Sequence, residues 1–297
     1  MNPGNDCMPH KANLTLNMRE DGLIKLAAEA ICEAEALLIT AGAGMGVDSG
    51  LPDFRGNEGF WNAYPPYRHL GLSFVELANP RRFRDDPALA WGFYGHRLNL
   101  YRATPPHAGF QILRGWGQRT AHGPCVFTSN VDGHFQRAGF ADDSVTEAHG
   151  SIHHAQCLKN CGVGIFSTDA VTISIDETSF RANSLPRCPR CDSLARPNIL
   201  MFGDNQWDDQ RIATQKQRQN QWIDVAYACR LVVIELGAGM AIPTVRRFSE
   251  RLAIAGEARL IRINLRESQV PDGHIGLSMG ALSGLQAIKM ELNDPAE

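Results

Sequence analysis

Short apolar runs alternate along the chain with longer segments in which apolar residues recur at helical spacing. The continuous apolar runs, which are typical of strands buried on both faces, lie at 36–40, 124–128, 230–236 and 260–264. The segments with helical spacing lie at 19–35, 87–101, 108–118 and 244–255. This alternation predicts an open parallel α/β sheet with helices on both faces. Residues 276–292 are predicted to form a helix followed by a strand, and the polar residues 1–18 a flexible tail.

Length and composition fit one large domain with a small insert. The chain has 297 residues, and 43% of them are hydrophobic, which is ample for a sizeable core. The net charge of −3 gives no sign of a nucleic-acid-binding or membrane-binding surface. No apolar run approaches the ~18 residues of a membrane span, and no basic segment followed by an apolar one opens the chain. We therefore expect a cytoplasmic protein.

The first apolar run leads into a turn with three glycines, Gly42, Gly44 and Gly46. Glycine lets the backbone approach a ligand closely, and a strand that ends in such a turn is typical of dinucleotide-binding sheets. The spacing alone is weak evidence, because the third glycine comes one residue early. An acid, an aromatic residue and a cation follow on a loop, at Asp53, Phe54 and Arg55. This loop is interpreted as part of an active site, and a plain turn with a surface salt bridge is the alternative.

Polar residues also follow the next buried run. Asn130 and Asp132 come after the strand at 124–128, where ligands sit in parallel sheets, although the stretch taken alone fits a polar turn better. His149 precedes Gly150 and follows a strand-like segment. A histidine with an ordinary pKa near 6.5 suits a general base, and a structural role is the alternative.

Two further groups of residues suggest binding chemistry. Tyr94 and Arg97 are three residues apart and share one face of a predicted helix. Arginine can clamp a carboxylate with two hydrogen bonds, and a tyrosine hydroxyl can add a donor, whereas a core tyrosine and a surface arginine are the alternative. Close cysteine pairs separated by a loop predict a structural zinc site with four thiolates, and metal-free thiols are the alternative. These pairs are Cys157 with Cys161 and Cys188 with Cys191.

A second glycine turn follows the run at 230–236. It contains Gly237, Ala238 and Gly239, whose backbone amides can bind phosphate. The run at 260–264 ends in Asn264.

Taken together, these motifs resemble the sirtuins, the NAD-dependent protein deacylases. The glycine-rich run through residue 56 resembles their cofactor signature, and Thr-x-Asn-Val-Asp-Gly, His-Gly, two cysteine pairs and Phe-Gly-Asp follow in the family's order. The resemblance covers about residues 20 to 290. It implies a Rossmann-type domain made of residues 19–150 and 196–297, with a small zinc-ribbon insert at 151–195.

The resemblance also implies roles for single residues. Asn130 and Asp132 would assist the departure of nicotinamide from NAD, and His149 would be the general base. Phe202 and Gly203 would flank the acyl-lysine channel, while Tyr94 and Arg97 would recognise an acidic acyl group such as succinyl or malonyl. The cofactor contacts would come from Gly42, Ala43, Gly44, Asp53, Phe54, Arg55, Ser129, Asn130, Asp132, Gly237, Ala238, Gly239 and Asn264.

The reaction implied is the removal of an acetyl or acidic acyl group from lysine in a protein or peptide, with nicotinamide and O-acyl-ADP-ribose as products. A monomer is expected. Three departures from the sirtuin motifs keep other functions open: Gly46 in place of Ser, Ser129 in place of Gln, and Ala238-Gly239 in place of Thr-Ser. One alternative is NAD-dependent ADP-ribosylation of protein or hydrolysis of NAD. The other is a non-enzymatic NAD-binding sensor or scaffold.

Overall fold

The largest element of the fold is a parallel sheet. The computed structural model describes residues 20–52, 60–62, 64–176, 178–256 and 258–293. Within them, six strands pair in the order β3-β2-β1-β7-β8-β9, and every neighbouring pair is parallel. The strands are β1 (Ala36–Ala41), β2 (Pro124–Thr128), β3 (Val145–Glu147), β7 (Leu231–Leu236), β8 (Ala258–Ile263) and β9 (Ile275–Leu277). This is the strand order of a Rossmann-type sheet.

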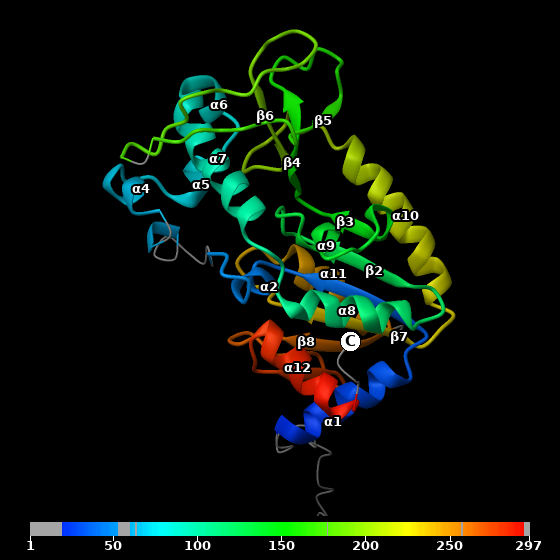
Figure 1. The fold of residues 1–297 in the computed structure, drawn as a ribbon. Coiled ribbons are helices and arrows are strands. Elements are labelled where there is room, and N and C mark those ends of the chain that lie inside the picture. The colour runs from blue at the N-terminus through cyan, green and yellow to red at the C-terminus, as the bar shows by residue number, and fades with distance from the viewer. Residues whose placement is uncertain (1–19, 53–59, 63, 177, 257, 294–297) are drawn as a thin grey trace, which may run out of the picture.

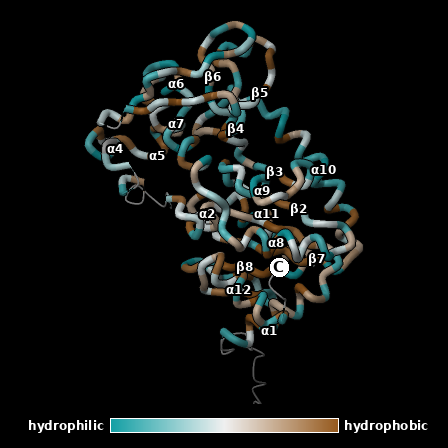
Figure 2. Tube along the Cα trace, in the orientation of Figure 1, coloured by the Kyte–Doolittle hydropathy of each residue, from teal (hydrophilic) through white to brown (hydrophobic). Residues whose placement is uncertain are grey.

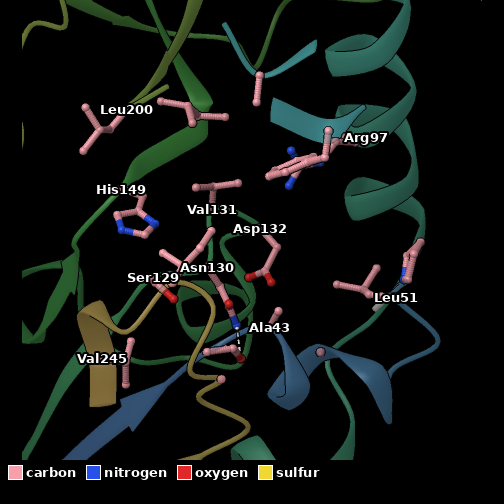
Figure 3. A pocket seen from close by; sticks show the side chains of 18 of the residues that line it. Ala43, Leu51, Arg97, Ser129, Asn130, Val131, Asp132, His149, Leu200 and Val245 are labelled. Atoms are coloured by element: carbon pink, nitrogen blue, oxygen red, sulfur yellow. Dashed lines mark hydrogen bonds between the residues drawn. The ribbon is translucent and has the colours of Figure 1, made fainter. Parts of the chain in front are cut away.

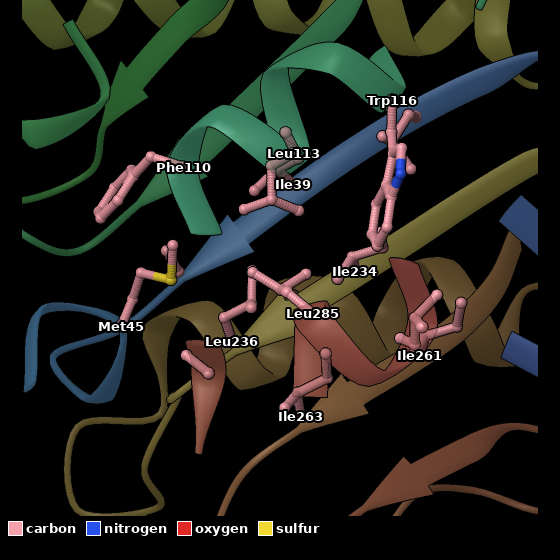
Figure 4. Close-up of a cluster of buried hydrophobic side chains, with 14 of the residues drawn as sticks. Ile39, Met45, Phe110, Leu113, Trp116, Ile234, Leu236, Ile261, Ile263 and Leu285 are labelled. Atoms are coloured by element: carbon pink, nitrogen blue, oxygen red, sulfur yellow. The ribbon is translucent and has the colours of Figure 1, made fainter. Parts of the chain in front are cut away.

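Helices cover both faces of this sheet, which is why its central strands consist of apolar residues (Figures 1 and 2). One face carries α1 (Glu20–Cys32), α8 (Ala108–Gln118) and α12 (Ala281–Glu291). The other face carries α10 (Gln210–Ala226) and α11 (Thr244–Ile254). Figure 4 shows Leu113 of α8 and Leu285 of α12 against Ile39 and Ile234 of the sheet.

A second, smaller unit lies above the sheet in Figure 1. Its strands β4 (Gly150–Cys157), β5 (Ile165–Ser167) and β6 (Ala195–Ile199) form an antiparallel sheet in the order β5-β4-β6. Four helices share its hydrophobic core: α4 (Pro65–His69), α5 (Phe74–Leu77), α6 (Arg82–Asp85) and α7 (Pro87–Ala103). Trp91 links α7 to the small sheet, because its indole N–H donates to the Ala195 carbonyl of β6 over 2.9 Å.

The pairing of the central strands decides where the sequence motifs meet. Ala41 at the end of β1 pairs with Thr128 of β2 on one side and with Leu236 of β7 on the other. The residues that follow these three strands are Gly42, Ser129 and Gly237. Because β1 is where the strand order reverses, a crevice for a ligand opens at this point. The short helices α2 (Gly44–Val47) and α9 (His134–Arg137) start just beyond it.

The predicted fold class is confirmed, and one local prediction is wrong. Residues 276–292 were expected as helix then strand, but β9 comes first and α12 follows. The limits of the small domain, at residues 150 and 196, stay a prediction. In the structure, helices α4 to α7, which precede residue 150, share a hydrophobic core with the small sheet. Among the helices in the described part of the chain, none combines the length and apolar character that a membrane span requires.

Candidate active site

A cavity of about 360 Å³ opens at the carboxyl ends of β1, β2 and β7 and extends toward α7; we call it the strand-end cavity (Figure 3). It brings together predicted residues from six separate stretches of the chain. These are Gly42, Ala43, Tyr94, Arg97, Ser129, Asn130, Asp132, His149, Phe202, Gly237, Ala238 and Gly239. Gly44, Gly203 and Asn264 lie outside the cavity lining. Asp53, Phe54 and Arg55 lie outside the described residues.

The two glycine turns pack directly on each other. Gly44 N donates to Gly237 O over 3.1 Å. Gly237 has φ +58°, and a Cβ added there would lie 2.4 Å from Gly44 backbone atoms. A Cβ on Gly42 would lie 2.8 Å from the Ala238 Cα. Glycine is therefore required here because the two backbones touch, which leaves the turn amides close together at one end of the cavity.

The second turn is held from outside the cavity by two polar residues. Asn264 Nδ2 donates to Ala238 O over 2.9 Å. Glu267 Oε2 accepts from the backbone N–H of Met240 over 3.0 Å. Asn264 therefore shapes the wall of the cavity without lining it.

Asn130 and Asp132 are fixed by backbone partners. Asn130 Nδ2 donates to Gly42 O over 3.0 Å, which ties the end of β2 to the first glycine turn. The Asp132 side chain is 7% exposed, and its Oδ1 accepts from the backbone N–H of His134 over 2.9 Å. Both side chains are thus oriented by the backbone, and Figure 3 shows them side by side at the end of β2.

His149 lies on the opposite wall of the cavity from Arg97 (Figure 3). Its Nε2 is 3.2 Å from the Thr244 hydroxyl oxygen. Burial lowers the pKa of His149 below its ordinary value, and a hydrogen bond with the Ser129 backbone opposes that shift only in part. The ring is therefore neutral at physiological pH, which is the form that can accept a proton.

The end of the cavity at α7 contains a buried cation among aromatic rings. Arg97 is 7% exposed, and its Nε and Nη2 donate to the Tyr101 hydroxyl over 2.9 and 2.7 Å. Its guanidinium carbon lies 5.3 to 5.8 Å from the ring centres of Phe93, Tyr94 and Tyr101. Burial raises the pKa of Tyr94 to about 12, so its hydroxyl keeps its proton. An anionic group that entered here would meet a fixed positive charge.

Phe202 borders the cavity from the segment after β6. It is 36% exposed, and its ring packs edge-on against Phe74 with the centroids 5.9 Å apart. Its backbone N–H donates to Ala78 O over 2.9 Å. Gly203 follows with φ +66°, outside the lining, where it lets the chain turn away.

The four predicted cysteines converge at the tip of the small sheet. Their sulfur atoms all lie within 4.8 Å of one another. Cys157 Sγ is 3.6 Å from Cys191 Sγ, and Cys161 Sγ is 3.5 Å from Cys188 Sγ. These separations exceed an S–S bond of about 2.05 Å and approach the ~3.8 Å edge of a tetrahedral Zn–S₄ site. The thiols therefore fit one tetrahedral metal ion.

Sequence reasoning missed three residues of the site. Tyr101 holds Arg97, Thr244 contacts His149, and Glu267 holds the second turn. The first had a signal, because Tyr101 lies one helical turn after Arg97 and faces the same side. Thr244 and Glu267 reach their partners only through the packing of β7, α11 and β8.

The comparisons with known proteins identify the family. The model of the Sir2 family matches residues 42–228, more than half of the chain. NAD-dependent protein deacylase 2 of Pyrobaculum aerophilum is 30% identical over 247 residues, which cover 82% of this chain and 85% of that protein. NAD-dependent protein deacylase 1 of Archaeoglobus fulgidus is 34% identical over 177 residues, or 59% of this chain and 62% of that protein. The chain belongs to the Sir2 family, as its resemblance to the sirtuins predicted.

Solved structures share the fold. A crystal structure of a Sir2 homolog–NAD complex has a TM-score of 0.64 at 24% identity, covering 91% of this chain and 94% of that chain. The structure of Sir2Tm bound to a propionylated peptide has a TM-score of 0.65 at 20% identity, covering 92% and 99%.

Proposed function

We propose that this chain is an NAD-dependent protein lysine deacylase that prefers acidic acyl groups. The relatives are named NAD-dependent protein deacylases, and the solved relatives include complexes with NAD and with a propionylated peptide. The observation that carries the proposal is one continuous cavity. It joins the paired glycine turns, the side chains of Asn130, Asp132 and His149, and the buried cation Arg97.

Each part of the cavity has a proposed role. When bound, NAD supplies the nicotinamide that leaves and the ADP-ribosyl group that accepts the acyl group. The glycine turns bind its phosphates through backbone N–H groups, since no side chain stands between ligand and backbone there. Asn130 and Asp132 orient the cofactor, and neutral His149 takes a proton from a hydroxyl at its Nε2, beside Thr244.

The acyl preference rests on the surroundings of Arg97. A buried guanidinium is a fixed positive charge with N–H donors in a planar fork, and this geometry suits the carboxylate of a ligand. Its Nε and Nη2 donate to the Tyr101 hydroxyl, and the Tyr94 ring lies beside the guanidinium. A succinyl or malonyl chain that reached from the lysine into this end of the cavity would place its carboxylate against this charge, with Tyr94 beside it.

The four thiols are proposed to hold a structural zinc ion. Four protein thiolates fill a tetrahedral site, so no position remains for water or substrate. The cluster joins β4, through Cys157, to the segment before β6, through Cys188 and Cys191. We expect one zinc ion per chain in the purified protein, measured by elemental analysis. The cytoplasmic location and the monomeric state stay predictions.

The test is NAD consumption with matched acetyl-, succinyl- and long-chain acyl-lysine peptides, with the products followed by mass spectrometry. We expect consumption that depends on peptide, with succinyl preferred, and formation of O-acyl-ADP-ribose. NAD cleavage that is the same without peptide would instead indicate the hydrolase. Transfer of ADP-ribose onto the peptide or protein would indicate the transferase. NAD binding without release of nicotinamide would indicate the sensor.

A further inference from the structure

A second cleft, of about 710 Å³, lies behind the segment that carries His149; we call it the polar cleft. One wall is the side of α10 that carries Arg211, Thr214 and Arg218, and the facing wall includes His153 and His154 of β4. Arg102 of α7 and Arg137 of α9 complete it. Every lining residue except Gly133 has a polar or charged side chain. The cleft is therefore lined by residues that can form hydrogen bonds or ion pairs with a ligand.

Four arginines meet in this cleft, and three of them form no ion pair among the described residues. Arg102 donates to the carbonyls of Val171 and Thr168, and both acceptors are neutral. Arg137 donates to the Tyr101 and Thr104 carbonyls, and Arg218 is exposed on α10. Their positive charges are thus not neutralised by a bonded carboxylate.

The carboxylates of the cleft leave these charges available. Glu147 is 1% exposed and already pairs with Arg211 over 2.5 Å. Asp142 and Asp169 are exposed, where solvent screens them. The Nδ1 atom of His154 is buried and has no hydrogen-bond partner among the described residues. The cleft therefore offers the positive charges of Arg102, Arg137 and Arg218 to a ligand.

These features define the class of ligand. Arginine forks match the oxygens of phosphate, and the cleft brings Arg102, Arg137 and Arg218 together from three helices. The ligand that fits these charges is an anion with several negatively charged oxygens. We propose that the polar cleft binds a phosphate-bearing anion and that this binding changes the affinity of the strand-end cavity for NAD.

The two sites share parts of the backbone, which is the basis for the proposed coupling. Glu147 lines the polar cleft, and His149, two residues later, lines the strand-end cavity. Asp132 and Gly133 are likewise divided between them. His153 Nε2 also lies 2.9 Å from the Asp132 carbonyl oxygen. A ligand between α10 and β4 would act on the segment that carries Asp132 and on the segment that carries His149. Only this coupling, and not the binding of the anion, rests on the proposed function.

Two charge reversals on the same helix test the binding. Arg218→Glu changes a residue of the cleft, whereas Lys216→Glu makes the same kind of change on α10 outside its lining. Sodium phosphate is titrated by calorimetry at constant ionic strength, with NAD saturating so that the strand-end cavity is filled. We expect the wild type and Lys216→Glu to bind alike and Arg218→Glu to bind at least about tenfold more weakly. Equal binding by Arg218→Glu and the wild type, or no binding by the wild type, would overturn the site.

The coupling is tested with the same variants, without catalysis. The Kd of NAD is measured at rising phosphate concentration, because coupling between two sites is reciprocal. Phosphate that competes with NAD at the glycine turns raises the Kd of NAD equally in all variants. Any difference in the phosphate dependence of this Kd between the wild type and Arg218→Glu is therefore due to the polar cleft. We expect that difference to be a few-fold, with Lys216→Glu behaving as wild type. Identical curves would exclude the coupling, and neither result depends on whether the protein removes acyl groups.

Discussion

The strand-end cavity has one end walled by backbone and another walled by large side chains. We call them the nucleotide end and the acyl end, after the ligands that we propose they bind. At the nucleotide end, Gly42 and Gly44 contact the turn at Gly237 so closely that no Cβ fits. At the acyl end, Arg97 lies among buried aromatic rings of α7. Backbone N–H groups are the same for nearly every residue type, so a wall of backbone does not discriminate through side-chain chemistry. The selectivity of a wall of side chains depends on which residues form it. The nucleotide end is therefore suited to one invariant ligand, and the acyl end to discrimination.

The departures from the sirtuin motifs fit this contrast. Gly46 stands where sirtuins usually have Ser, and a Cβ there would lie 3.1 Å from Leu51 Cδ1. At the second turn, where Ala238 and Gly239 stand in place of Thr-Ser, Asn264 and Glu267 hold the backbone. Both changes alter side chains at the nucleotide end while its backbone contacts remain.

The strongest test concerns the point where the two ends meet. If the two ends of the cavity only bind NAD and the acyl peptide, the chemical step depends on His149. His149→Gln should then lower peptide-dependent turnover by about 100-fold to 10,000-fold, because a general base is lost. The Kd of NAD and the Kd of the acyl peptide should stay within about a factor of two. Single-turnover kinetics and calorimetry measure the two quantities. Wild-type turnover in this variant would remove His149 from the proposed mechanism.

The next test adds one methyl group to the nucleotide end. Gly237→Ala should lower the free energy of unfolding by roughly 3 kcal/mol, because the residue has φ +58° and its Cβ would meet Gly44 at 2.4 Å. Gly239→Ala is the matched control, since its Cβ would have its nearest neighbour at 3.5 Å. We expect the control to change stability by less than about 1 kcal/mol. Denaturant unfolding measures both, and equal losses would show that contact between the turns is not the cause.

At the acyl end, a substitution should change preference more than stability. Arg97→Met keeps most of the buried volume and removes the cation, so the ratio of desuccinylation to deacetylation should fall by about tenfold to a hundredfold. Arg97→Lys keeps the charge but loses the planar fork, so an intermediate ratio is expected. The measurement is kcat/KM with matched peptides. An unchanged ratio in Arg97→Met would mean that this end does not recognise the carboxylate through Arg97.

The smallest expected effect is a pH profile that separates the ends. A general base accepts a proton only when neutral, so with His149 in the proposed role kcat/KM should rise with pH and level off above the pKa of His149. Burial lowers that pKa, and half-maximal activity should therefore fall below the ordinary value of about 6.5. Arginine does not titrate in this range, so the ratio of succinyl to acetyl activity should stay constant. A midpoint at or above about 6.5 would contradict the buried environment of His149.

Sequence patterns predicted the parts of the molecule that depend on local spacing. Continuous apolar runs identified β1, β2, β7 and β8, because a strand buried on both faces needs apolar residues at every position. The cysteine spacing identified the thiol cluster for a similar reason, since a tetrahedral site needs ligands in close pairs. The order of β9 and α12 was predicted wrongly, because a three-residue strand is too short to show a period.

The chain alone thus determined the class of fold, the family, and which residues carry chemical groups. Tertiary structure decided what those groups touch. Tyr101 accepts from Arg97, Thr244 lies beside His149, and Gly44 serves the contact between two turns instead of lining the cavity. It also created the polar cleft, whose walls come from α7, α9, β3, β4 and α10 and from segments between these elements. Periodicity and motif spacing report neighbours within a strand or helix, whereas contacts between distant segments are set by how sheets and helices pack.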